Sequence, residues 1–258
     1  MSMTGGDKII GGRRWLYGII GLTAVAAAAC GWVGGSSGAN PGDGEGPDFV
    51  VQNVDPSPLC PDAKVISDGF NVSAAGLADN ALAARQARDP QLRLEQYGSW
   101  GRVIGSYAQW TYVTPSTLSE EEISKLSKAE LRAYRDKIQK EALENPFLAA
   151  TCSVELYKTG EGTRRAFPLL AEEARNPAAD PQGFTPTVTE RPQPEVGNEG
   201  VDLVYHYPTF NVFVLIFRQR NVLASLSVVA SGSDTADYVE VLAESLARRL
   251  DQTLKPVE

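Results

Sequence analysis

Apolar residues form one continuous run near the N-terminus, and farther along the chain they alternate or recur at helical spacing. The run from Leu16 to Val33 is 18 residues long, has no charged side chain and follows the basic pair Arg13 and Arg14. A basic start before an apolar stretch is typical of a segment directed to a membrane. This length suits both a long signal sequence and a short membrane span, so it does not choose between them.

Cys30 lies inside this run, in the sequence Ala27-Ala28-Ala29-Cys30-Gly31. These residues resemble a bacterial lipobox, in which small residues precede a cysteine that is cleaved and lipidated. Lipoboxes usually carry Leu or Val where this chain has Ala27. The resemblance implies lipidation of Cys30. The alternatives are an uncleaved membrane helix, in which Cys30 packs as a small apolar residue, and a signal that is removed entirely.

Residues 34–48 predict a flexible linker, because Gly, Ser, Pro and acidic residues replace the apolar ones. We therefore divide the chain into a signal or anchor segment at 1–33, the linker at 34–48 and an extracytoplasmic domain at 49–258. The last part is long enough for one sizeable core.

The first half of this domain predicts helices and strands in alternation. Asp89-Pro90 followed by Gly98 predicts a short helix, after a less periodic one near 79–88. Residues 102–113 alternate as a strand does. Capping boxes at Ser119 and Ser127 predict a short helix that bends into a longer one ending near 144.

The second half predicts a strand at 150–158, a helix at 162–175 and then a Pro-rich strap at 176–200. Phe184, Val188 and Val196 give this strap something to bury. Three strands at 201–207, 211–218 and 222–230 form an antiparallel meander, and the uninterrupted apolar run in the second predicts a strand covered on both faces. A helix capped by Asp234 follows. These elements predict an α+β fold with an antiparallel or mixed sheet and helices mainly on one face.

The strand Asn221-Val222-Leu223-Ala224-Ser225-Leu226-Ser227-Val228, followed by the helix positions Leu242, Ala243, Leu246 and Leu250, has a recognisable packing pattern. It resembles the closing strand and helix of extracytoplasmic sensor-type domains found on some actinobacterial receptor kinases and lipoproteins. The resemblance covers about 40 residues and implies a kind of fold, without any functional residue. Those domains carry additional paired cysteines that this chain does not have.

The cysteines and the charge limit the compartment and the partners. If Cys30 is lipidated or lies in the membrane, Cys60 and Cys152 remain and can pair in an oxidising compartment. Such a disulfide would contribute roughly 4 kcal/mol to the stability of the fold. The alternative is two buried thiols. The chain has 32 acidic and 24 basic residues, and three of the basic residues but one of the acidic ones precede residue 31, so the remainder is near −10. This balance excludes nucleic acid as an expected partner.

Catalytic and metal-binding motifs are not recognisable. The one histidine, His206, follows Val-Tyr near the end of an expected strand, and no Gly-x-Ser-x-Gly elbow accompanies it. With one histidine and no Cys-x-x-Cys, the sequence offers no ligand set for zinc or haem. We expect no cofactor, no metal and no enzymatic activity, although a pair of carboxylates of the glycosidase type would not be visible in sequence.

Aromatic residues are the remaining candidates for a binding site. Tyr and Trp often line ligand clefts, so we expect Trp100, Trp110, Tyr112 and Tyr207 to contact a ligand if the sheet leaves one face open. Strand aromatics also commonly build a core. The expected function is a membrane-tethered, non-enzymatic envelope protein that binds a small ligand or a protein partner. The alternatives are an accessory subunit of a membrane complex and, less favoured, an extracytoplasmic hydrolase.

Overall fold

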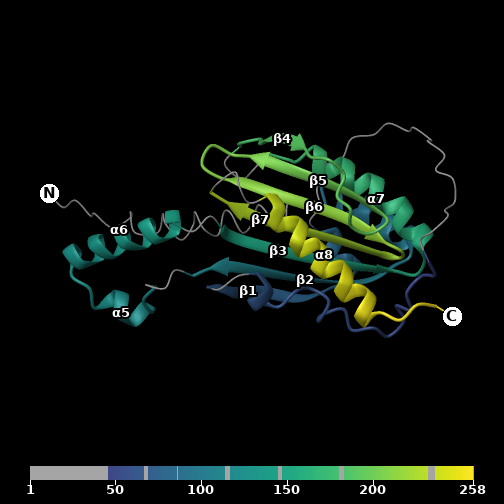
Figure 1. Cartoon of the computed structure of the whole chain (residues 1–258), viewed down its shortest axis with the longest axis horizontal. Coiled ribbons are helices and arrows are strands. Elements are labelled where there is room, and N and C mark those ends of the chain that lie inside the picture. The colour runs from purple at the N-terminus through teal and green to yellow at the C-terminus, as the bar shows by residue number, and fades with distance from the viewer. Residues whose placement is uncertain are drawn as a thin grey trace.

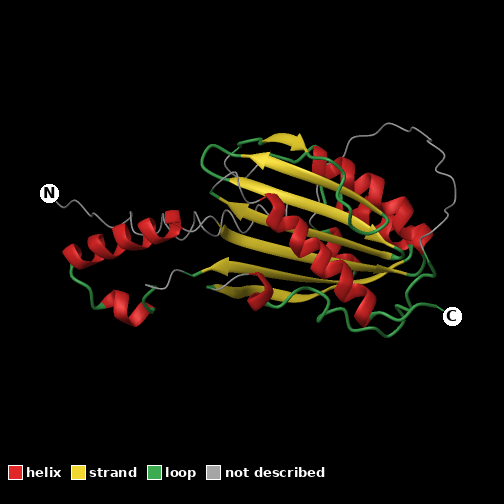
Figure 2. Cartoon of the chain, viewed as in Figure 1, coloured by secondary structure: helices red, strands yellow, loops and turns green. Residues whose placement is uncertain are grey.

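The structure is a computed structural model that describes residues 46–66, 69–85, 87–113, 117–144, 147–179, 183–231 and 236–257. The expected leader, Cys30, the linker up to residue 45 and the Asp234 cap lie outside these residues. A seven-stranded sheet in the order β1-β2-β3-β7-β6-β5-β4 forms the centre of the fold, and every pair of neighbouring strands is antiparallel (Figures 1 and 2). The expected α+β class and antiparallel pairing are confirmed.

The strands are bounded as follows: β1 Phe70–Ala78, β2 Arg102–Tyr112, β3 Phe147–Tyr157, β4 Thr187–Glu190, β5 Glu199–His206, β6 Asn211–Gln219 and β7 Val222–Ala230. The predicted meander corresponds to β5, β6 and β7. Its middle strand, β6, is buried on both faces, as the apolar run predicts. The strap contributes β4 at one edge of the sheet and the buried Val196, whereas Phe184 is exposed.

The helices are α2 Ala63–Ile66, α3 Asn80–Ala84, α4 Pro90–Trp100, α5 Glu120–Ser124, α6 Lys128–Glu144, α7 Gly160–Arg175 and α8 Ala236–Thr253. Three of them, α3, α4 and α7, cover one face of the sheet, and α8 lies across the other (Figure 1). Each face therefore has its own hydrophobic core. Because both faces are covered, strand aromatics are not simply displayed on an open side.

The helices α5 and α6 form an arm that extends from the end of the sheet where β2 ends and β3 begins (Figure 1). The predicted capping box is present: Ser119 accepts a hydrogen bond from the Glu122 N–H, and the Glu122 carboxylate accepts one from the Ser119 N–H. Among the arm residues whose burial is described, no side chain is fully buried. The arm thus contributes nothing to either core.

The N-terminal part of the described chain is fastened to the sheet at two places, the middle of β3 and the turn between β6 and β7. Cys60 and Cys152 form the expected disulfide, with Cα atoms 5.9 Å apart, which joins residues 92 apart in sequence. Asn221, in the turn between β6 and β7, is fully buried; its side chain accepts a hydrogen bond from the Phe49 N–H and donates to the carbonyls of Phe49 and Tyr157. The segment before residue 61 is therefore an integral part of the fold.

Candidate functional site

The four aromatic residues expected to bind a ligand do not form one site. Trp110 is 1% exposed in the core beneath α8, and Trp100 is 8% exposed in the core beneath α7, so both are core residues and this part of the expectation is corrected. Tyr112 and Tyr207 are half-buried, but they pack against the cores on opposite faces of the sheet. The expectation fails because helices cover both faces.

His206 lies at the exposed end of β5. Its ring nitrogens are 3.1 Å from the Thr189 hydroxyl and 3.0 Å from the Asn211 side-chain oxygen. These contacts tie β5 to the adjacent strands β4 and β6. This is the arrangement of a hydrogen-bonded surface histidine. Among the described residues there is also no group of three or more His, Cys, Asp or Glu side chains placed to hold a metal ion.

A different set of residues forms a groove of about 390 Å³ on the face of the sheet covered by α3, α4 and α7. We call it the hydroxyl groove. Two rows of polar residues cross its floor in register: Tyr107, Ser153 and Ser225 in one row, and Gln109, Thr151 and Ser227 in the next. Each row passes from β2 through β3 to β7. Polar side chains therefore occupy the centre of the sheet, where apolar ones would ordinarily pack.

Most of these polar groups have no partner within the described chain. Thr151 and Ser227 share a hydrogen bond, with their hydroxyl oxygens 2.6 Å apart. In the same described residues, the side chains of Tyr107, Gln109, Ser153 and Ser225 make no hydrogen bond to the protein. Each of these four groups both donates and accepts. Together they leave the floor with unused hydrogen-bonding capacity that faces the groove.

A buried ion pair closes one end of the groove. The Arg102 guanidinium lies 3.2 Å from the Glu155 carboxylate and donates hydrogen bonds to the side-chain oxygen of Asn80 and the Ala78 carbonyl. The Tyr157 hydroxyl donates to the same carboxylate. Burial raises the pKa of Tyr157 well above its ordinary value. The charges of Arg102 and Glu155 at this end of the groove therefore compensate each other, and the Tyr157 phenol beside them stays neutral.

Helices form the walls. Leu82 of α3 lines the groove and is 40% exposed, and Leu170 of α7 lines it from a buried position. A buried ion pair between Arg93 and Glu173 joins α4 to α7. Burial raises the pKa of the Glu173 carboxyl to about 6, although the Arg93 guanidinium opposes the rise. The wall between these helices is therefore fixed by polar as well as apolar contacts.

α7 begins close to the end of α4, and glycine makes this approach possible. A Cβ at Gly162 would lie 2.1 Å from the Trp100 carbonyl oxygen, so any larger residue would push the two helices apart. Thr159 caps α7 by accepting a hydrogen bond from the Gly162 N–H. This close contact sets the position of Leu170, two turns farther along the same helix, over the sheet.

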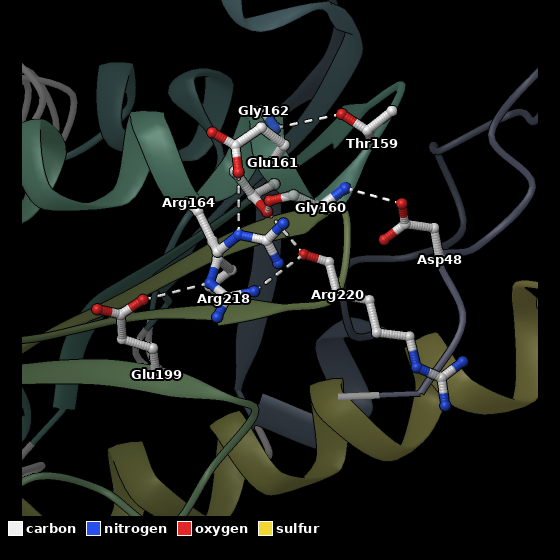
Figure 3. Close-up of polar contacts among 10 residues, drawn as sticks. Asp48, Thr159, Gly160, Glu161, Gly162, Arg164, Glu199, Arg218 and Arg220 are labelled. Carbon is white, nitrogen blue, oxygen red and sulfur yellow. Dashed lines mark hydrogen bonds and ion pairs between the residues drawn. The ribbon is translucent and has the colours of Figure 1, made fainter. Parts of the chain in front are cut away.

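The start of α7 also holds the N-terminal segment. Figure 3 shows the Asp48 carboxylate accepting a hydrogen bond from the Gly160 N–H, at 2.9 Å. The positive end of the helix dipole favours a carboxylate at this position. Arg164, Arg218 and Arg220 lie in the same region, and the Arg218 guanidinium is 3.2 Å from the Glu199 carboxylate (Figure 3). The chain that leads back to the linker therefore enters at this end, away from the α5–α6 arm (Figure 1).

The groove was missed in the sequence because its signal is spread over three strands. Thr151, Ser153 and Glu155 alternate with buried apolar residues in β3, and Ser225 and Ser227 do so in β7. Polar alternation normally marks a face open to solvent. The strand alone does not reveal that the polar residues of β2, β3 and β7 lie side by side under helices.

No family model matches the chain, and no curated protein matches it. Among solved structures, the extracellular domain of PknH from Mycobacterium tuberculosis is similar to 80% of this chain over 100% of its own length, with 9% identity and a TM-score of 0.45. In the described residues, no helix combines the length and the apolar character that a membrane crossing needs.

Proposed function

We propose that this chain is a membrane-tethered, extracytoplasmic envelope protein without enzymatic activity, which binds a small ligand in the hydroxyl groove. The observation that carries the proposal is the set of hydrogen-bonding side chains without protein partners on the floor of the groove, at Tyr107, Gln109, Ser153 and Ser225. A volume of about 390 Å³ lies within the range of small-molecule sites, roughly 300–1,000 Å³.

The polar floor is hard to explain as a contribution to stability. β3 and β7 are interior strands of the sheet, and their other faces are apolar and buried. Tyr107, Gln109, Ser153 and Ser225 are half-buried on the floor of the groove, where valine or isoleucine would stabilise the sheet more than these polar residues do. Positions where a chain departs from the stable choice are often functional. Ligand binding gives these side chains the partners that the protein does not provide.

Two observations support a location outside the cytoplasm. The Cys60–Cys152 disulfide suits an oxidising compartment, and the N-terminal sequence has the basic start and apolar run of a membrane-directed segment. The proposed anchor is a lipid on Cys30, with an uncleaved single helix as the alternative.

The groove favours binding over catalysis. A nucleophilic serine needs a base within hydrogen-bonding distance. In the described chain, neither Ser153 nor Ser225 is hydrogen-bonded to a histidine or a carboxylate, and the Glu155 carboxylate at the end of the groove is paired with Arg102. These contacts support a receptor-like role rather than a hydrolase.

Native mass spectrometry tests ligand binding. The full chain is released from its own membrane in mild detergent, and we expect it to carry the additional mass of a small molecule. The double variant Ser153→Leu/Ser225→Leu fills the floor of the groove and should lose that mass. Val241→Ser, at an exposed position on α8 that faces away from the groove, is the control and should retain it. A wild-type protein without bound ligand, or a filled variant that retains it, would contradict the proposal.

The anchor needs a separate measurement. Mass spectrometry of the membrane fraction should find a peptide that begins at Cys30 and carries a diacylglyceryl group. Recovery of intact protein that contains Met1 would instead support the single-helix anchor. A soluble mature chain that begins after residue 33 would overturn both forms of attachment.

A second candidate function is that of a subunit in a membrane complex, and the α5–α6 arm favours it. The apolar stripe of the arm includes Ile123, Leu126, Leu131 and Tyr134, which are only half-buried. Partly exposed apolar side chains on a projecting element are common in protein contacts. Co-purification from solubilised membranes, with Leu126→Ser/Leu131→Ser compared with the wild type, tests this candidate. Loss of one defined protein partner in the variant would support it.

A further inference from the structure

The floor of the hydroxyl groove is a grid of uncharged groups that both donate and accept hydrogen bonds. Neighbouring strands lie about 4.8 Å apart and alternate residues along a strand about 6.6 Å apart, so these distances set the spacing of the grid. Its members with unused hydrogen-bonding capacity are three hydroxyls and one amide, at Tyr107, Ser153, Ser225 and Gln109, whereas Thr151 and Ser227 are paired with each other. Such a grid can bind several polar groups of one ligand at the same time.

We propose that the ligand of this groove is an uncharged, polyhydroxylated molecule of the carbohydrate class, about one or two sugar units in size; this inference rests on the proposed function. A sugar hydroxyl donates and accepts in the same way as the hydroxyls of Ser153 and Ser225. Each can therefore satisfy the other without a change of protonation or a counterion.

The charges in the groove disfavour ionic ligands. The guanidinium at its end, Arg102, already contacts Glu155, Asn80 and the Ala78 carbonyl, so binding an anion would require these contacts to break. The Glu155 carboxylate would also repel an anion. A cationic ligand would have to displace Arg102 from the same carboxylate. A neutral ligand leaves the buried pair intact.

The composition of the groove also disfavours a wholly apolar ligand. A hydrocarbon chain over the floor would leave the hydroxyls of Ser153, Ser225 and Tyr107 buried without partners, which costs free energy. The β6 side of the floor is apolar, because Ile216 and Val214 lie beside Ser225 and Ser227 in the sheet. A sugar ring has polar hydroxyls and apolar C–H surfaces, and this combination matches both sides.

Tyr107 contributes an aromatic ring next to the grid. Gly76 of β1 lies opposite Tyr107 in the sheet, and a methyl group at Gly76 would be 3.2 Å from the Tyr107 hydroxyl and 3.4 Å from its ring. The missing side chain therefore allows the phenol to lie across β1. Gly76→Ala should shift this ring while leaving Ser153 and Ser225 in place, which provides a test of the contribution of Tyr107.

The test is methyl NMR of the full chain in detergent micelles, titrated with defined probes. The neutral probes are mono- and disaccharides of glucose, galactose, mannose and arabinose. Glucosamine and glucuronate are charged probes of similar chemistry, and octanol is the apolar probe. We expect at least one neutral saccharide to shift the methyl signals of Leu170, Val214 and Ile216 and to leave those of Leu242 and Leu246, which belong to α8 on the opposite face, unchanged.

Two variants then link binding to the grid. Ser153→Val/Ser225→Val should weaken that saccharide about tenfold, the effect of losing two neutral hydrogen bonds. Gly76→Ala should weaken it by a smaller factor. Val241→Ser should bind as the wild type does, and thermal melting of each variant shows whether it is folded.

The possible results separate the ligand class from the proposed function. If only the charged or apolar probes shift the groove methyls, the carbohydrate inference is overturned and ligand binding in the groove stands. If a neutral saccharide binds equally well to the Ser153→Val/Ser225→Val variant, the grid is not its site and the inference fails. If no probe shifts these methyls at millimolar concentration, the carbohydrate inference is overturned, and native mass spectrometry then decides whether the groove binds anything.

Discussion

If Ser225 is present in order to bind a ligand, its replacement by valine should raise the stability of the domain. Ser225 is half-buried on β7 between Ser153 of β3 and Ile216 of β6, and in the described chain its hydroxyl has no hydrogen-bond partner. Ser225→Val loses no protein hydrogen bond. Valine is favoured over serine in strands on a scale that spans about 1 kcal/mol, and its added carbons are partly buried.

We therefore expect Ser225→Val to raise the free energy of unfolding by about 1 kcal/mol, which corresponds to a Tm about 2–4 °C higher for a domain of this size. Ser227→Val is the matched comparison, because it makes the same substitution two residues along the same strand. The Ser227 hydroxyl bonds to Thr151 at 2.6 Å and is nearly inaccessible. Its removal leaves the Thr151 hydroxyl unpaired, at a cost of about 1–3 kcal/mol.

Ser225→Val should thus be more stable than the wild type and Ser227→Val less stable. The free energies of unfolding of the two variants should differ by about 2 kcal/mol. Urea unfolding followed by circular dichroism measures both, with the disulfide intact. If Ser225→Val were destabilised as much as Ser227→Val, its hydroxyl would have a structural role, and the argument that the floor is kept polar for a ligand would lose its basis.

Three further predictions concern the fold that holds the groove. Reducing the disulfide, or replacing Cys60 and Cys152 with alanine, should lower the free energy of unfolding by about 2–5 kcal/mol in urea titrations; an unchanged midpoint would contradict its stabilising role. Asn221→Ala leaves three buried backbone groups without partners and should lower the free energy of unfolding by about 3 kcal/mol. Asn176→Ala, at the exposed end of α7, should lower it by less than about 1 kcal/mol, and equal losses would contradict a special role of the Asn221 hydrogen bonds in holding the N-terminal segment. Burial raises the pKa of the Asp202 carboxyl to about 6, so between about pH 4 and 6 the folded state binds a proton that the unfolded state does not. The free energy of unfolding therefore falls as the pH rises through that window. Asp202→Asn should remove up to about 3 kcal/mol of that pH dependence, and a pH profile of Tm identical to that of the wild type would contradict the shift.

The strands with strong apolar patterns were predictable from sequence, and the weakly patterned edge was not. The uninterrupted apolar residues of β6 predicted a strand buried on both faces, because a strand with one face in solvent would alternate apolar and polar residues. β1 escaped prediction because its sequence, FNVSAAGLA, consists largely of small residues with little strand preference. It is a strand because β2 provides a partner at the edge of the sheet.

The candidate site depended on information that no single segment carries. Cys60 and Cys152 could be paired in prediction because, once Cys30 is assigned to the leader, no other partner remains for either. The groove needs the register of β2, β3 and β7 together, and that register emerges only when the sheet is assembled. The pattern of β2 does not tell whether a helix will cover Trp110, and the predicted end of the preceding helix at Gly98 left out Trp100, which is the last residue of α4 and faces the core.

Ligand binding in the hydroxyl groove is tested most directly by a crystal structure of the full chain, purified from its own membrane with its bound molecule retained. We expect density for a small molecule in the groove, within hydrogen-bonding distance of Ser153 and Ser225 and beside the ring of Tyr107. Density for a bound molecule elsewhere on the domain, with only water over these serines, would contradict it.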